Sequence, residues 1–200
     1  HKHDMLRRIY TQNIDGLDRE AGVPDDFLME AHGSYATSTC RKCQKKYEYK
    51  ELEKGFAAGK PIYCKDCGGI IKPDVVFYGE ELPERFITLV NTDFAFADLL
   101  IVIGTSLNVS PCSHIPGFCK DDCPRVLINA SKVATYEEEL VLDKRTNKLI
   151  DKKEKFHKEL FKFDHKTNRR DIFLGGDCQE ACKKIIEALD WKKDYLVMCE

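Results

Sequence analysis

The sequence predicts an α/β fold in which a parallel sheet has helices on both faces and a small zinc-binding domain is inserted into the chain. Two observations predict the sheet: short apolar, β-favouring runs alternate with helix-like segments, and each run ends in small or polar residues. A third observation predicts the insert, because the chain carries two Cys-x-x-Cys pairs separated by twenty residues.

The composition is typical of a soluble domain of moderate size. Of the 200 residues, 42% are apolar, which suffices for a sizeable core, and 33% are charged. No apolar run approaches the roughly 20 residues of a membrane helix, and the first residues do not form a signal peptide. We therefore expect no membrane partner and a location in the cytoplasm, the nucleus or both.

The first predicted strand, at about residues 6–11, breaks abruptly into Gln12, Asn13 and Asp15. In an open α/β sheet, ligands bind beyond the carboxyl ends of the strands. A short helix is predicted next, before His32. Taken singly, each of these residues has an ordinary explanation, since Asn and Asp often form turns after strands and a lone histidine is usually structural.

Four cysteines have the spacing of a metal site. Cys40, Cys43, Cys64 and Cys67 form two knuckles, each of which turns two thiolates toward one point. The alternative is a redox dithiol, but two pairs so close together, flanked by Lys and Arg, favour zinc. In a chain with ten cysteines and no secretory signal, metal binding is also favoured over disulfides. Four sulfurs complete the coordination shell, so we expect one structural Zn²⁺ in an insert at residues 38–72.

The segment that follows the second knuckle predicts an edge strand. Its centre, residues 75–77, is β-branched and aromatic, whereas Pro73 restricts it to an edge or irregular position. Such an edge suits an extended peptide that adds itself as a further strand. The alternative is a connecting segment with a buried Val-Val-Phe triplet.

Hydrophobic periodicity predicts the remaining elements. We expect strands near residues 47–49, 98–107, 125–129 and 171–174, and helices at about 17–21, 51–58, 82–97 and 179–189. Five consecutive apolar residues, Leu99 to Ile103, suit a parallel strand covered on both faces. Asp177 is expected to cap the last helix.

The ends of the sheet strands carry groups suited to a ligand. They are Gln12, Asn13 and Asp15, then Gly104, Thr105 and Ser106, then Asn129, and finally residues 175–178. Because the carboxyl ends of parallel strands share one edge, the sequence predicts a nucleotide site there. The Gly-rich turn that normally follows the first strand of a dinucleotide fold is absent. Since the chain does not begin with Met and enters a strand almost at once, we expect the first βα unit to lie upstream of His1.

The net charge of −2 hides a basic stretch. Residues 141–170 carry 11 Lys or Arg and five Asp or Glu. Two interpretations stay open: a contact surface for an acidic partner, and a solvated insertion docked by its scattered apolar residues, which is favoured. No recognisable nucleic-acid-binding module accompanies the stretch, so we expect no direct nucleic-acid binding.

In combination, these motifs resemble the catalytic core of the sirtuins, the NAD-dependent protein deacylases. The resemblance covers about Tyr10 to Trp191 and rests on TQNIDGL, AHG, the two cysteine knuckles, KPDVVFYGE, GTSL, LIN and GDC. The closing DWKK is similar to the tubulin-deacetylase branch of class I. The resemblance implies a Rossmann-like NAD-binding domain at residues 1–37 and 73–200, with a basic insertion around 134–170, and a zinc ribbon at 38–72.

The resemblance also implies roles for individual residues. The NAD-binding residues would be Gln12, Asn13, Ile14, Asp15, Gly104, Thr105, Ser106, Asn129 and Cys178, and the substrate-binding residues Val76, Phe77, Gly79, Glu80, Leu107 and Val109. The catalytic residues would be His32, Asn13 and Asp15. His32 would be the general base, a task that suits imidazole because this group titrates near neutral pH.

The implied reaction transfers the acyl group of an acylated protein lysine, of histone or tubulin type, to ADP-ribose with release of nicotinamide. Two alternatives stay open: a protein mono-ADP-ribosyltransferase that uses the same NAD site, and a non-enzymatic zinc-ribbon interaction module. The second explains the cysteines but not the polar groups at the strand ends. The family's Gly-Ala-Gly-x-Ser turn and its residues that select acidic acyl groups are not in this sequence, so the acyl-chain preference is left open.

Overall fold

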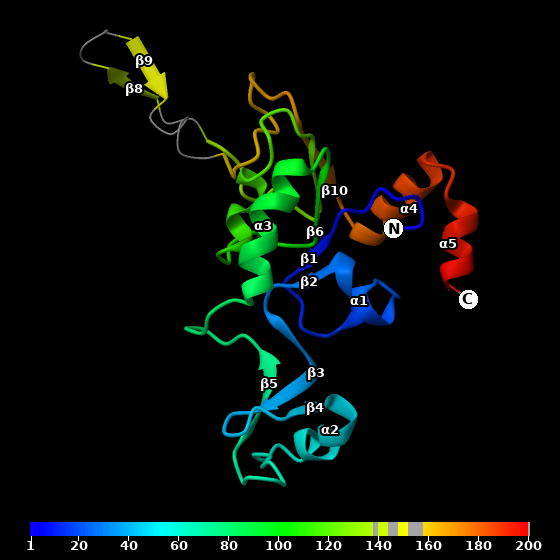
Figure 1. The fold of residues 1–200 in the computed structure, drawn as a ribbon. Helices are drawn as coiled ribbons and strands as arrows, with labels where there is room; N and C mark the ends of the chain where they lie inside the picture. Colours follow the sequence, from blue (N-terminus) through cyan, green and yellow to red (C-terminus); the bar gives the residue numbers. More distant parts are fainter. Residues whose placement is uncertain (138–139, 144–147, 152–157, 200) are drawn as a thin grey trace. The chain divides into compact units, whose positions relative to one another are not determined.

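The structure is a computed structural model that describes residues 1–137, 140–143, 148–151 and 158–199 (Figure 1). The chain divides into two compact units, an N-terminal unit (His1–Leu89) and a C-terminal unit (Val90–Glu200), and each is described by itself. Both contain parallel strands and helices, which confirms the α/β class. The predicted domain boundaries at 37/38 and 72/73 stay predictions. Within the predicted basic stretch, residues 144–147 and 152–157 lie outside the described residues.

The N-terminal unit begins with a parallel strand pair. β1 (Ile9–Thr11) and β2 (Leu28–Glu30) are joined by α1 (Leu17–Glu20) and by the 3₁₀ turn η1 (Asp25–Phe27). β2, which the sequence analysis missed, buries its first two side chains. Among the described residues, β1 pairs with β2 in a two-stranded parallel sheet of this unit.

The same unit contains a three-stranded antiparallel sheet around the cysteines. Its order is β4 (Lys46–Glu48), β3 (Gly33–Cys40) and β5 (Ile71–Val75), so β5 is an edge strand as predicted. α2 (Tyr49–Ala57) follows β4 and begins with a capping box between Glu48 and Glu51, which satisfies otherwise unpaired backbone N–H groups. Figure 1 shows this helix beside the short sheet. Its small core consists of Cys40, Tyr47, Leu52, Cys64 and Ile71, with Phe56, Ile62 and Cys67 packed against them.

α3 (Glu84–Phe96) contains the division between the units. Phe86, Val90 and Phe94 are buried, and their spacing of four residues places them on one face of the helix, as the periodicity predicts. In the N-terminal unit, the Phe86 ring packs edge-on against Tyr10, with 5.9 Å between the ring centroids. The face of α3 that carries these three apolar side chains is therefore its buried face.

The C-terminal unit is built on a parallel sheet of order β10 (Asp171–Gly175), β7 (Arg125–Asn129) and β6 (Leu100–Ile103). The 3₁₀ turn η2 (Cys112–Gly117) lies between β6 and β7, and α4 (Cys178–Ala188) and α5 (Lys192–Cys199) follow β10. Within residues 134–170, β8 (Leu140–Asp143) and β9 (Lys148–Asp151) form an antiparallel pair. Among the described helices, none is both long and apolar enough to cross a membrane.

The faces of β6 differ from the prediction. Leu100 and Val102 are buried, but Ile101 and Ile103 are 45% and 49% exposed. Successive side chains of a strand point to opposite faces, so only one face of this strand is covered by the described residues. The apolar run correctly predicted a parallel strand, but the expectation that both faces are covered was wrong for the described residues.

The covered face of this sheet carries a buried ion pair that the sequence analysis missed. Arg125 is 1% exposed, and its Nε and Nη2 donate to the two carboxylate oxygens of Asp171 at 2.6 and 2.7 Å. The remaining guanidinium N–H groups donate to the backbone carbonyl oxygens of Pro116, Lys158 and Leu160, with nitrogen–oxygen distances of 2.7–3.0 Å. All five N–H donors of the side chain therefore have acceptors, which is the condition under which such a pair is tolerated in a core.

Replacing Arg125 by Met is expected to lower the free energy of unfolding by about 3–5 kcal/mol, because it leaves the Asp171 carboxylate buried without its partner. Urea denaturation measures this change. Lys158→Met is the control, because that side chain is 65% exposed in its pair with Asp121 and should matter little. The double variant Arg125→Met/Asp171→Leu should regain part of the loss. A single variant as stable as the parent would contradict this account.

Candidate functional site

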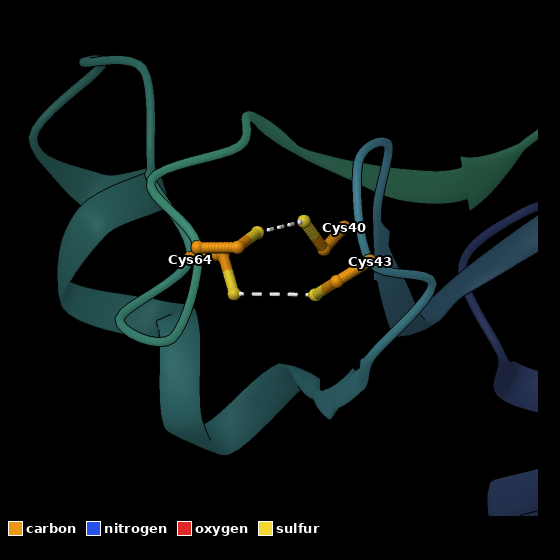
Figure 2. Close-up of side chains that lie close together, drawn as sticks. Cys40, Cys43 and Cys64 are labelled. Atoms are coloured by element: carbon orange, nitrogen blue, oxygen red, sulfur yellow. Dashed lines mark hydrogen bonds between the residues drawn. The ribbon is translucent and has the colours of Figure 1, made fainter.

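The four predicted zinc ligands converge in the N-terminal unit. Their sulfur atoms all lie within 4.8 Å of one another, with 3.5 Å between Cys40 and Cys67 and 3.6 Å between Cys43 and Cys64. Tetrahedral coordination with Zn–S bonds of about 2.3 Å requires sulfur–sulfur distances of about 3.8 Å. Figure 2 shows Cys40, Cys43 and Cys64 turning their sulfurs toward a common centre from two separate loops. The geometry and the all-sulfur donor set therefore fit a structural Zn²⁺.

Hydrogen bonds stabilise negative charge on these sulfurs. The Tyr47 hydroxyl, in the small core, donates to Cys64 Sγ at 3.0 Å, and the Lys42 backbone N–H donates to Cys40 Sγ at 3.4 Å. The bond from Tyr47 is the main reason that the pKa of Cys64 falls to about 6. Metal sites commonly rely on such outer-shell donors. Tyr47 is thus a supporting residue that the cysteine spacing could not reveal.

β1 and β2 place His32 beside the loop that follows β1. Thr11 pairs with Glu30, and the Ala31 N–H donates to the Thr11 carbonyl oxygen at 3.0 Å. Just beyond this pairing, His32 Nδ1 lies 3.0 Å from the carbonyl oxygen of Gln12. Because a carbonyl oxygen only accepts hydrogen bonds, Nδ1 carries the ring proton of the neutral imidazole and Nε2 keeps the lone pair. The ring of His32 is half-buried, and this bond orients it with Nε2 on the side opposite the Gln12 carbonyl oxygen.

The loop after β1 carries further predicted site residues of the N-terminal unit. Asn13 and Asp15 are exposed, and Ile14 is half-buried, with its carbonyl oxygen accepting the Tyr35 N–H at 3.3 Å. The Asp15 carboxylate accepts the Leu17 N–H at 3.0 Å. Asp15 therefore has a local structural task at the start of α1, beside the role that the resemblance implies.

An ion-pair network ties α1 to β2. Arg19 makes three contacts of 2.8–3.2 Å with the Glu30 carboxylate and a further contact with Asp25. These carboxylates, Glu30 foremost, raise the pKa of Arg19. Since Glu30 lies two residues before His32, the network fixes the short segment that leads to the predicted base. The sequence analysis missed Arg19, whose main partner lies eleven residues away.

The predicted peptide-binding segment of this unit continues from β5. The Val76 N–H donates to the His32 carbonyl oxygen at 2.8 Å, so this segment lies next to the predicted base. Phe77, Gly79 and Glu80 are exposed in the turn that follows. Gly33 permits the close approach, because a Cβ there would collide with the Asp74 backbone.

The C-terminal unit brings its predicted nucleotide-binding residues to the carboxyl edge of its sheet. The Gly104 N–H and Cys178 Sγ both donate to the Ile128 carbonyl oxygen, at 3.0 and 3.6 Å. The Asn129 side-chain amide donates to the Thr105 carbonyl oxygen at 3.4 Å. These groups come from the ends of β6 and β7 and from the start of α4, as the strand-end argument predicts.

Three further predicted residues follow β6. Ser106 is exposed, Leu107 is buried, and Val109 is 40% exposed. The Thr105 hydroxyl accepts the Leu107 N–H at 3.1 Å, which tightens the turn after the strand. α4 begins at Asp177, whose carboxylate accepts two backbone N–H groups and so forms the predicted N-cap. The structure thus assembles the predicted residues within each unit, and their individual roles stay predictions.

Comparison with known proteins places the chain in a family. The Sir2 family profile matches residues 1–111. The chain is 39% identical to the NAD-dependent deacetylase sir2A of Dictyostelium discoideum, over 96% of this chain and 34% of the relative. It is 35% identical to the NAD-dependent protein deacetylase sirtuin-3 of Mus musculus (98% and 50%) and 36% identical to sirtuin-2 of Danio rerio (95% and 48%). The chain spans about a third to a half of the length of these three relatives. The chain belongs to the Sir2 family.

Proposed function

We propose that the protein is an NAD-dependent protein-lysine deacetylase or deacylase, which transfers the acyl group of a protein lysine to ADP-ribose and releases nicotinamide. The observation that carries the proposal is the orientation of His32, whose Nδ1–H bond to the Gln12 carbonyl oxygen leaves Nε2 as the proton acceptor. The relatives are named as NAD-dependent deacetylases, which supports the same reaction.

The chain supplies two sets of residues for NAD⁺. Gln12, Asn13 and Asp15 follow β1, and they would hold the nicotinamide end. Around Gly104, the edge of the C-terminal sheet offers small and polar groups, including Thr105 and Asn129. A ligand can approach the protein backbone closely at a glycine, because this residue has no side chain. When bound, NAD⁺ supplies the ADP-ribose that receives the acyl group.

His32 would act on the substrate side as a general base. Nε2 would take a proton from a hydroxyl. The bond from Nδ1 to the Gln12 carbonyl oxygen would keep the ring in one orientation and stabilise the positive charge of the imidazolium that forms. The acyl-lysine peptide would bind along the segment after β5, which contacts the His32 backbone. Acylation removes the lysine charge, so the side chain can enter an apolar passage without a large desolvation cost.

The test is an assay of the purified protein with NAD⁺ and an acetyl-lysine peptide. We expect one nicotinamide and one O-acetyl-ADP-ribose for each acetyl group lost, with one water consumed, and no reaction without NAD⁺. Mass spectrometry of the peptide is decisive: it should lose the acyl group and gain no ADP-ribose. A peptide that keeps its acyl group would refute the proposal.

We further propose acetylated proteins of histone or tubulin type as substrates. The support is the likeness of the DWKK sequence, residues 190–193, to the tubulin-deacetylase branch. Comparing kcat/KM for acetylated histone and tubulin peptides tests this choice. If the kcat/KM values of both peptides equal that of an unrelated acetylated peptide, the proposed substrate type is refuted.

A further inference from the structure

Lys72, on β5, makes three contacts with the segment that follows this strand. Its Nζ donates to the Val75 carbonyl oxygen at 2.7 Å and to Glu80 Oε2 at 2.7 Å. The same ammonium lies 4.1 Å from the centroid of the Phe77 ring. The Lys72 side chain is only 19% exposed, so these contacts are partly shielded from water. One side chain thus joins the start, middle and end of residues 75–80, which we name the β5 loop.

Glu80 closes the β5 loop from the other side. Its Oε2 accepts the Phe77 backbone N–H at 2.9 Å, while its own N–H donates to the Phe77 carbonyl oxygen at 3.0 Å. The bond from Lys72, followed by that from Phe77, lowers the pKa of the Glu80 carboxyl. Glu80 Oε2 therefore accepts hydrogen bonds from both Lys72 and the Phe77 backbone, and these two bonds stabilise the conformation of the loop.

The position of the loop is also fixed at its start. Val75 pairs with Gly33, and the Val76 N–H donates to the His32 carbonyl oxygen at 2.8 Å. Beyond this anchor the loop turns outward, and Phe77 is 50% exposed. The first residues are thus held by the backbone next to His32, whereas the exposed turn depends on side-chain contacts for its shape. Lys72 supplies most of those contacts.

We propose that Lys72 is a positioning residue, which presets the β5 loop in the conformation that receives an acyl-lysine peptide. The inference rests on the proposed function for the identity of the ligand, and on the contacts above for the loop itself. A loop ordered before binding loses less conformational entropy when the peptide docks, so its loss should weaken peptide binding. The chemical step, which depends on His32, should be much less affected.

The first measurement is independent of activity. Hydrogen–deuterium exchange of the free protein should show faster exchange at residues 76–80 in Lys72→Met than in the parent, because the loop loses its cation. Lys72→Arg keeps a cation that can reach the same carboxylate and ring face, and it should restore slow exchange. Lys60→Met, at an exposed lysine of the same unit, is the matched control and should leave exchange unchanged.

The second measurement separates binding from chemistry. For an acetyl-lysine peptide, Lys72→Met should raise KM about tenfold and change kcat less than about threefold, since a charge-assisted contact is lost from the loop and not from the reacting atoms. The KM for NAD⁺ should stay at the parental value, and Lys72→Arg should recover most of the peptide KM. If the parent does not deacylate the peptide, the proposed function fails while the exchange measurement still tests the loop. Unchanged exchange in Lys72→Met, or faster exchange with an unchanged peptide KM, would overturn the role of Lys72.

Discussion

Replacing His32 by Ala is expected to lower NAD⁺-dependent deacylation by about 10²–10⁴, the usual effect of removing a positioned general base. The fold should survive, because the structural contacts at this position are made by the backbone: the Ala31 N–H bonds to the Thr11 carbonyl oxygen, and the His32 carbonyl oxygen accepts from Val76. The substitution removes the bond between His32 Nδ1 and the Gln12 carbonyl oxygen. Nicotinamide release and peptide deacylation are to be measured together.

His114→Ala is the matched control, since this histidine is exposed and is not among the predicted site residues. It should keep the parental rate. Melting temperature and zinc content should remain parental in both variants. Parental turnover in His32→Ala would refute the general-base assignment. If His32→Ala loses turnover and also melts at a much lower temperature than the parent, the histidine has a structural role instead.

The second large effect is expected at the zinc site. Cys64→Ser should reduce bound zinc from one ion per chain toward none, because thiolate ligation contributes about 10–16 kcal/mol of binding free energy in small zinc domains and is coupled to their folding. Cys64 also belongs to the small core between α2 and the antiparallel sheet, and it accepts the Tyr47 hydroxyl. Elemental analysis gives the zinc content, and limited proteolysis of residues 33–75 reports on the sheet.

Cys182→Ser, in α4 and outside the cluster, is the control for changing a half-buried cysteine. It should keep one zinc per chain and parental resistance to protease. Retention of tightly bound zinc by Cys64→Ser would contradict four-cysteine coordination. A parent protein that carries no zinc after purification in metal-replete medium would contradict the site altogether.

Local patterns were the part of the structure that the sequence predicted well. The strand expected at residues 125–129 is β7, because a short apolar run with turn residues on either side has few other solutions. The four-cysteine cluster was also predictable, since each knuckle is set by the covalent geometry of a few adjacent residues. The expected helix near 179–189 is α4, with Asp177 as its cap.

Features that depend on distant partners were not predictable. β3 has the sequence GSYATSTC, which lacks clear apolar alternation, and it is a strand because β4 and β5 pair with its two edges. Lys72 is the first residue of the KPDVVFYGE motif, but its three contacts exist only because the β5 loop folds back onto its side chain. In the same way, the exposure of Ile101 depends on which other elements cover that face of the sheet, and the sequence of β6 alone does not reveal this.

The buried pair of Arg125 and Asp171 also sets an order of events during synthesis. The two residues are 46 positions apart, so at a translation rate of 5–20 residues per second Arg125 leaves the ribosome roughly 2–9 s before its carboxylate partner. Until then its guanidinium remains hydrated, because an unpaired charge is costly to bury. β6 and β7 leave the ribosome first. β10 can pair with β7, and the Arg125 charge can be neutralised, only after Asp171 has emerged. During nascent-chain growth, the edge of β7 that pairs with β10 therefore stays unpaired for that interval.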